Sequence, residues 1–150
     1  MTSSNFEEII RFAIDKERDS VNFYQDLAEK VEDPVVKDQI LKMADEERKH
    51  EKLLMNLSPK QLAMVQQPAQ DDLKLSNYMD DVNARPDMTY RELLIIAMKR
   101  EQMAYDFYTE LELRASDDAT RKVFTLLKGE ELRHKRQIEK EYEKGFMSED

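Results

Sequence analysis

The 150-residue sequence contains no cysteine. Within these residues this excludes disulfides, thiolate nucleophiles, iron–sulfur clusters and a cysteine-ligated iron centre, because each of them needs sulfur from the protein. Glycine and proline are also scarce, with two and four residues. Signals for tight turns are therefore few, and long uninterrupted elements are expected.

Long apolar segments are missing as well. No apolar run approaches the roughly 20 residues of a membrane-spanning helix. The start of the chain is polar and acidic, unlike a secretion signal. Positive charge is in the minority, and the net charge of −9 disfavours nucleic acid and anionic membranes as partners, because their phosphates would be repelled. We therefore expect a cytoplasmic protein that binds neither.

What the chain does contain is typical of helices. Charged residues make up 38% of the sequence, and most of them are strong helix formers. The length suits one domain, 1–150, with a single core. The pattern predicts four long helices, at about residues 4–31, 34–56, 89–115 and 117–144.

Two start signals and one long connector organise these helices. Asp33 precedes a proline as an N-cap, and Thr89 with Glu92 forms a capping box. Residues 57–88 carry three of the four prolines and separate the first helix pair from the second. We expect an all-α four-helix bundle of two helical hairpins joined by one long crossover, whose own structure the sequence leaves open.

The two histidines belong to one repeated pattern, with a glutamate three residues before each and another glutamate further upstream. The matching members are Glu17 and Glu101, Glu47 and Glu131, and His50 and His134. The differences 101−17, 131−47 and 134−50 are equal, and we call this constant difference the repeat offset. Other identical pairs share it: Ala13/Ala97, Phe23/Phe107, Tyr24/Tyr108, Leu27/Leu111, Asp33/Asp117 and Glu46/Glu130. Duplication of a helical hairpin accounts for them together and predicts pseudo-two-fold packing.

These polar residues fall where helical periodicity places the core. In the second predicted helix, Glu47 and His50 continue an apolar seam with steps of three and four residues. The apolar members of that seam are Val36, Ile40, Met43, Leu54 and Leu57. The other three predicted helices likewise place a glutamate on their core face.

Four carboxylates in one core need a counter-charge. A buried ionised carboxylate costs of the order of several kcal/mol, and like charges add repulsion. Two divalent cations would balance four carboxylates, and neutral imidazoles would add nitrogen donors without adding charge. Protonation is the alternative, but it leaves a polar cluster in the core.

Spacing suggests how the ligands divide, because residues three apart on a helix share a face. We expect one metal on Glu17 and His50, the other on Glu101 and His134, and bridging by Glu47 and Glu131. Open positions would remain for water, dioxygen or peroxide. Iron and manganese both accept such oxygen-rich mixed sites, and zinc could enter by mismetallation.

The pattern resembles the ferritin-like di-iron carboxylate superfamily, most closely its rubrerythrin-type branch. The likeness rests on one glutamate from each of two helices, a Glu-x-x-His within 45–50 and 129–134, and Phe-Tyr pairs at 23–24 and 107–108. It covers roughly residues 5–144. It implies a ferritin-like bundle with two iron ions, and a homodimer.

The sequence departs from that branch at two points. Rubrerythrins proper also carry a cysteine-ligated iron domain as an electron relay, and these residues contain no cysteine. The resemblance further implies a glutamate three residues after Glu101, where this chain has Ala104. The family's redox-linked movement of one iron onto that glutamate therefore does not carry over.

Tyr24 and Tyr108 lie seven residues after Glu17 and Glu101, on the same helix faces. They could donate a hydrogen bond to the site or lie on an electron path, and the alternative is a purely structural aromatic core. Beyond these and the metal ligands, the sequence indicates no catalytic residue.

The functional hypothesis is a ferroxidase- or peroxidase-like di-iron oxidoreductase that oxidises Fe(II) with dioxygen or hydrogen peroxide. Its electrons would come from a separate donor protein. The alternative is a non-catalytic protein that binds iron or another metal for buffering or delivery. A third hypothesis, a metal-free acidic helical scaffold, predicts that chelation leaves the melting temperature unchanged.

Overall fold

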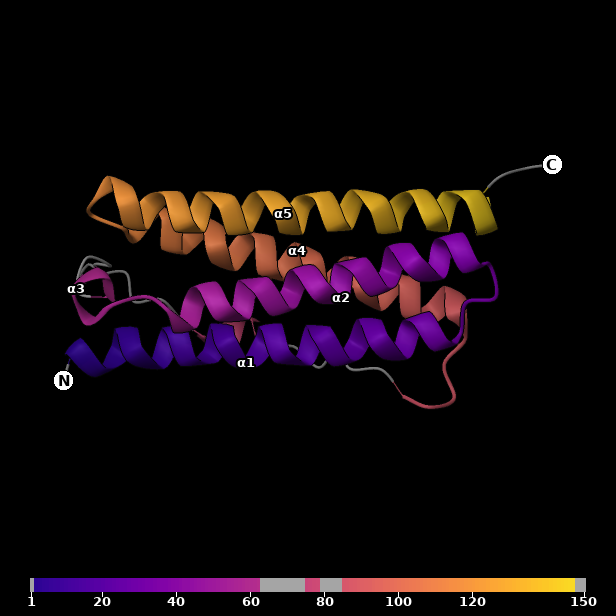
Figure 1. Ribbon diagram of the computed structural model, residues 1–150, viewed down its shortest axis with the longest axis horizontal. Coiled ribbons are helices and arrows are strands. Elements are labelled where there is room, and N and C mark those ends of the chain that lie inside the picture. The colour runs from indigo at the N-terminus through magenta and orange to yellow at the C-terminus, as the bar shows by residue number, and fades with distance from the viewer. Residues whose placement is uncertain (1, 63–74, 79–84, 148–150) are drawn as a thin grey trace. The chain divides into compact units, whose positions relative to one another are not determined.

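The computed structural model describes residues 2–62, 75–78 and 85–147 (Figure 1). Its four long helices are α1 (Thr2–Glu29), α2 (Pro34–Met55), α4 (Tyr90–Arg114) and α5 (Asp118–Tyr142). Short helical pieces are α3 (Pro59–Leu62), η1 (Leu75–Tyr78) and η2 (Glu143–Met147). The residues that the structure describes include no β-strand, and the all-α class is confirmed. None of their helices is long and apolar enough to cross a membrane.

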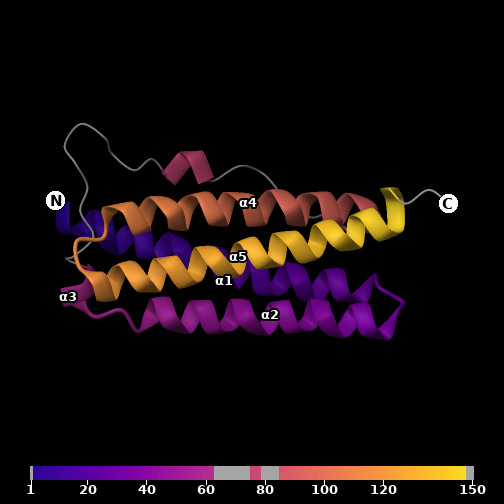
Figure 2. The ribbon, with the colours of Figure 1, turned by 90° about the horizontal axis from the view of Figure 1, so that it is seen from above.

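The chain divides into two compact units, Met1–Ala63 and Met64–Asp150. Each is built on one helical hairpin. In the first unit α1 packs against α2, and in the second α4 packs against α5 (Figures 1 and 2).

The starts of α2 and α4 follow the capping signals of the sequence. The side chain of Asp33 accepts a hydrogen bond from the Val35 amide at 2.9 Å, and Pro34 occupies the first turn of α2. At the start of α4, Thr89 Oγ1 accepts from the Glu92 amide at 3.1 Å. Glu92 in turn accepts from the Thr89 amide at 2.9 Å, so the capping box is complete.

Helix ends are shifted from the expected bounds by a few residues. We expected the first helix over about 4–31, but α1 spans Thr2–Glu29. The amides of Lys30 and Val31 bond to carbonyls three residues back, at 3.0 and 3.2 Å. This tightened final turn satisfies carbonyls that the α-helix leaves open.

Only parts of the expected crossover, 57–88, belong to the described residues. They include α3 and η1, and η1 packs on α4, where the Tyr78 and Phe107 ring centroids lie 5.2 Å apart. The rest of the crossover prediction, at 63–74 and 79–84, falls outside the described residues.

The buried face of α5 repeats that of α2. The buried positions of α2 include 36, 40, 43, 47, 50 and 54, and those of α5 follow at the repeat offset: 120, 124, 127, 131, 134 and 138. Full burial of one large apolar side chain contributes about 1.5–3 kcal/mol, so these seams contribute to the stability of the fold. Both seams carry a glutamate and a histidine one turn apart.

Candidate metal centre

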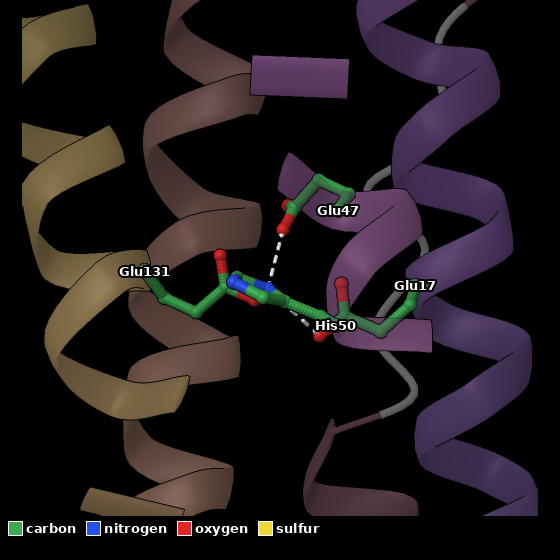
Figure 3. A group of neighbouring side chains, drawn as sticks. All are labelled: Glu17, Glu47, His50 and Glu131. Atoms are coloured by element: carbon green, nitrogen blue, oxygen red, sulfur yellow. Dashed lines mark ion pairs between the residues drawn. The ribbon is translucent and has the colours of Figure 1, made fainter. Parts of the chain in front are cut away.

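The first triad lies in the α1–α2 hairpin. Glu17 comes from α1, and Glu47 and His50 come from adjacent turns of α2. The Nδ1 atom of His50 lies 2.9 Å from Glu47 Oε1 and 3.6 Å from Glu17 Oε2 (Figure 3). Three polar side chains from two helices therefore converge on one point within the first unit.

The second triad repeats this arrangement in the α4–α5 hairpin. Glu101 comes from α4, and Glu131 and His134 come from α5. The Nδ1 atom of His134 lies 3.3 Å from Glu131 Oε1 and 3.5 Å from Glu101 Oε2. All six predicted ligands of the two triads are buried, and none is more than 3% exposed.

The separations within each triad fit ligands of a shared cation. Each residue offers one ligand atom, and within a triad these atoms lie within 4.8 Å of one another. Two ligand atoms, each about 2.1 Å from one first-row dication at a right angle or slightly wider, lie roughly 3.0–3.4 Å apart. The four observed nitrogen–oxygen distances, 2.9 to 3.6 Å, bracket that range. In both triads the same ring nitrogen faces both carboxylates.

Charge also favours a cation. Each triad combines two carboxylates with one imidazole, so a protonated imidazole would balance only one negative charge. Keeping the other carboxylate ionised away from water is costly. A divalent ion balances both, and a neutral imidazole then serves as a nitrogen donor. The residues present therefore fit a metal.

An ion pair beside the first triad was not predicted. Arg18 Nε donates to Glu51 Oε2, and these are the residues directly after Glu17 and His50. The hydrogen bond that Arg18 donates to Glu51, together with the negative charge of Glu51, raises the pKa of Arg18. The pair joins α1 to α2 next to the ligands. Its sequence signal was available, because the two opposite charges have the same sequence separation as Glu17 and His50.

The second unit has a different polar tie between its helices. Lys128 Nζ lies 2.6 Å from Glu112 Oε1, and Thr125 Oγ1 also donates to Glu112. Hydrogen bonds from Lys128 and Thr125 lower the pKa of Glu112. One repeat offset earlier, the counterparts of Glu112 and Lys128 are two buried alanines, Ala28 and Ala44. The same register is thus packed with small apolar residues in one hairpin and with an ion pair in the other.

Tyr24 and Tyr108 are both buried, two turns along their helices from Glu17 and Glu101. Tyr24 makes an edge contact with Phe23 at 5.4 Å between centroids. Tyr108 has neighbouring rings on both α4 and α5. Their predicted roles toward the site stay predictions.

Ala104, at the position where the resemblance implied a further glutamate, is half-buried on α4. It offers no ligand atom. Residue 104 therefore supplies no carboxylate to a metal held by the second triad.

Two buried Glu/Glu/His triads, one in each of two hairpins of long helices, define the class of ferritin-like helical carboxylate proteins. The rubrerythrin family matches residues 8–142, and the chain belongs to that family. A hypothetical protein from Pyrococcus furiosus has a similar solved structure, with a TM-score of 0.72 and 29% sequence identity. That similarity covers 92% of this chain and 88% of the other. No curated protein matches the chain.

The comparisons confirm the predicted resemblance and the predicted fold class, a ferritin-like four-helix bundle made of two hairpins with a long crossover. Membership of the rubrerythrin family implies metal binding, typically of iron, and each hairpin supplies Glu and His side chains capable of it.

Proposed function

We propose that this protein is a di-iron oxidoreductase that oxidises Fe(II) with dioxygen or hydrogen peroxide. The observation that carries the proposal is the duplicated triad. Each hairpin buries two carboxylates and an imidazole, with nitrogen–oxygen separations typical of ligands to one cation. A single such triad could be a structural ion pair, but repetition of all three residues at one offset favours a shared role.

In this proposal the two triads contribute to one dinuclear centre. Glu17 and His50 would hold one iron, and Glu101 and His134 would hold the other. Glu47 and Glu131 would supply a carboxylate to both ions. An iron pair bound there would supply one electron per ion to an oxidant.

The protein's own groups set the chemistry of that centre. Four carboxylates place negative charge around the ions and so stabilise the higher oxidation state. Burial limits access of water and favours small oxidants. Each imidazole must be deprotonated at its ligand nitrogen, so metal binding weakens as the pH falls.

The partners follow from the same reasoning. Residues 1–150 contain no cysteine for a relay iron, so a catalytic cycle needs electrons from a centre outside them. We therefore include a separate electron-donor protein in the proposal. A homodimer, a cytoplasmic location, and the absence of nucleic-acid and membrane partners also belong to it. Manganese is the alternative metal, and zinc is the expected contaminant.

Anaerobic reconstitution with Fe(II), followed by mixing with dioxygen or peroxide, tests the proposal. Optical spectra should report fast oxidation of both ions. Electron paramagnetic resonance then distinguishes the arrangements, because two coupled ferric ions give no signal whereas isolated ferric ions give a high-spin signal. Failure of the protein to bind Fe(II), or binding without oxidation, would contradict the proposal.

A binding role without turnover is the second candidate, and Ala104 favours it. The second triad lacks the additional carboxylate of redox-cycling relatives, so a bound ion has one ligand fewer to move to. Repeated additions of peroxide in the presence of a reductant separate the two candidates. Sustained consumption supports the enzyme, whereas one stoichiometric oxidation supports iron buffering or delivery.

A further inference from the structure

A row of aromatic rings crosses the second unit. Tyr78 of η1 contacts Phe107 of α4, with centroids 5.2 Å apart and planes at 66°. Phe107 contacts Tyr108 at 5.4 Å, and Tyr108 stacks on Phe124 of α5 at 6.5 Å and 17°. All three spacings fall in the range of direct aromatic contact. Figure 2 shows the short helical piece η1 alongside α4.

The row has an inner and an outer end. Tyr108 lies two turns after Glu101 on α4, and Phe124 lies two turns before Glu131 on α5. Two turns correspond to about 10 Å along a helix axis. Tyr108 and Phe124 are fully buried, whereas Tyr78 is half-buried. The row therefore leads from the neighbourhood of the second triad to a side chain that solvent reaches.

The repeat offset does not carry the two ends of this row into the first unit. Its counterpart of Phe124 is Ile40, and Tyr78 lies in the crossover, outside the repeat. The pair Phe23 and Tyr24 corresponds to Phe107 and Tyr108, with the same 5.4 Å spacing. In the second unit, Phe124 and Tyr78 extend the duplicated pair with residues that have no aromatic counterpart at the repeat offset.

We propose that Tyr78, Phe107 and Tyr108 form a one-electron relay in the second unit, and that Tyr78 is its outer terminus, where a phenoxyl radical forms. The inference rests on the proposed oxidation chemistry of the metal centre. It adds a route by which oxidising equivalents leave the bundle interior without damaging it.

The surroundings of Tyr78 suit this role. Burial, together with the negative charges of Glu110 and Asp106, raises its pKa, while Arg114 acts in the opposite direction. The phenol is therefore protonated at neutral pH, and the negative charge of the same carboxylates favours departure of an electron.

The balance of the step is simple. The Tyr78 phenol loses one electron and one proton, and its O–H bond breaks to give a neutral phenoxyl radical. The two electrons of the iron pair reduce one hydrogen peroxide, so a second hydrogen peroxide is the oxidant of the relay. It takes two such electrons, with two protons, and becomes two waters. A small external one-electron reductant of the ascorbate type then returns a hydrogen atom to Tyr78. Phe107 is not oxidised, and its ring serves as the contact between the two phenols.

Freeze-quench electron paramagnetic resonance of the Fe(II)-loaded protein after mixing with peroxide in excess over the iron pairs tests the relay. Optical absorbance of the same samples reports iron oxidation separately. We expect a tyrosyl radical in the wild type, narrowed when the tyrosines are ring-deuterated. Tyr78→Phe should abolish that signal, and Phe107→Leu should strongly reduce it, with iron oxidation still present in both variants.

The repeat provides a matched control. Phe23→Leu makes the same change at the corresponding residue of the first unit and should leave the radical in place. Circular dichroism and melting curves establish that each variant is folded. Iron oxidation with no radical, or a radical that survives Tyr78→Phe, would overturn the relay and leave the proposed function standing. Absence of iron oxidation itself would overturn both.

Discussion

His50 and Glu47 lie one turn apart on α2, with Nδ1 of the histidine 2.9 Å from Oε1 of the glutamate. The same relationship recurs at the repeat offset between His134 and Glu131, at 3.3 Å. Two independent helices thus hold an imidazole and a carboxylate in the same relative position, in contact with a second carboxylate from the partner helix of each hairpin. The repeat in the sequence is therefore also a repeat of the same buried group of two carboxylates and one imidazole.

Replacement of a proposed bridging ligand tests whether the two triads act together. Glu47→Ala should release both metal ions or leave a badly damaged site, because a bridge belongs to both ions. Metal content after anaerobic loading and desalting measures this. Asp45→Ala, two residues away and exposed, is the control and should bind normally. Clean loss of one ion, with the other bound as tightly as before, would instead indicate two separate sites.

Removal of metal should lower the melting temperature. A ligand that binds only the native state at 100 times its dissociation constant stabilises it by about 2.7 kcal/mol. For a chain of this size that corresponds to a shift on the order of 5–10 °C. Calorimetry with and without chelator measures it. The double variant His50→Ala/His134→Ala should show no chelator effect, and an unchanged wild type would favour the metal-free scaffold.

Alkaline stability should depend on Tyr90. Burial, and to a lesser extent the charge of Glu141, raises the pKa of Tyr90 from 10.0 to about 12. The pKa of Tyr90 is higher in the folded state than in the unfolded state. The contribution of Tyr90 to the free energy of unfolding is therefore complete below pH 10 and is lost as the pH rises toward about 12. The free energy of unfolding measured with urea should therefore decline from pH 8 to 11.5, and Tyr90→Phe should reduce that decline. Equal slopes in both proteins would contradict this assignment.

The Glu112–Lys128 pair should couple α4 to α5. Lys128→Ala leaves Glu112 partly buried without its partner and should destabilise the protein by about 1 kcal/mol. The double variant Glu112→Ala/Lys128→Ala reproduces Ala28 and Ala44 of the first hairpin, and we expect it to lose less than the sum of the single variants. Strict additivity in urea unfolding would show that the pair contributes nothing.

The same pair should affect stability in acid. Hydrogen bonds from Lys128 and Thr125 lower the pKa of Glu112 in the folded state. Its contribution is therefore present above the ordinary glutamate pKa, near 4.5, and is lost as the pH falls through the lowered folded value. In the Glu112→Gln variant, the free energy of unfolding should depend less on pH over this acidic range.

Placing a carboxylate at residue 104 should change the rate of reaction with peroxide. Ala104→Glu adds an oxygen ligand one turn after Glu101, at the position where redox-cycling relatives carry one, and should speed repeated turnover with peroxide. Stopped-flow oxidation and reduction rates measure this. Ala104→Gln, with similar size but no charge, is the matched control. An unchanged rate in the glutamate variant would show that the missing carboxylate at residue 104 does not limit turnover with peroxide.

Much of the fold was predictable because local chemistry fixed it. The capping signals at Asp33 and Thr89 placed the starts of α2 and α4 correctly. The helix ends were less accurate, because the final turn of α1 depends on which carbonyls find partners rather than on side-chain pattern. The assignment of all six metal ligands stays a prediction, although each is buried as the seam positions required.

The sequence by itself determined the duplicated pattern and the helical class, because a fixed offset and a helical period are properties of the chain alone. Only the tertiary structure decided which nitrogen of each imidazole faces the carboxylates and that Tyr78 reaches Phe107. Those contacts join residues from different elements, and side-chain orientation across a helix–helix interface is set by packing. No local periodicity encodes it.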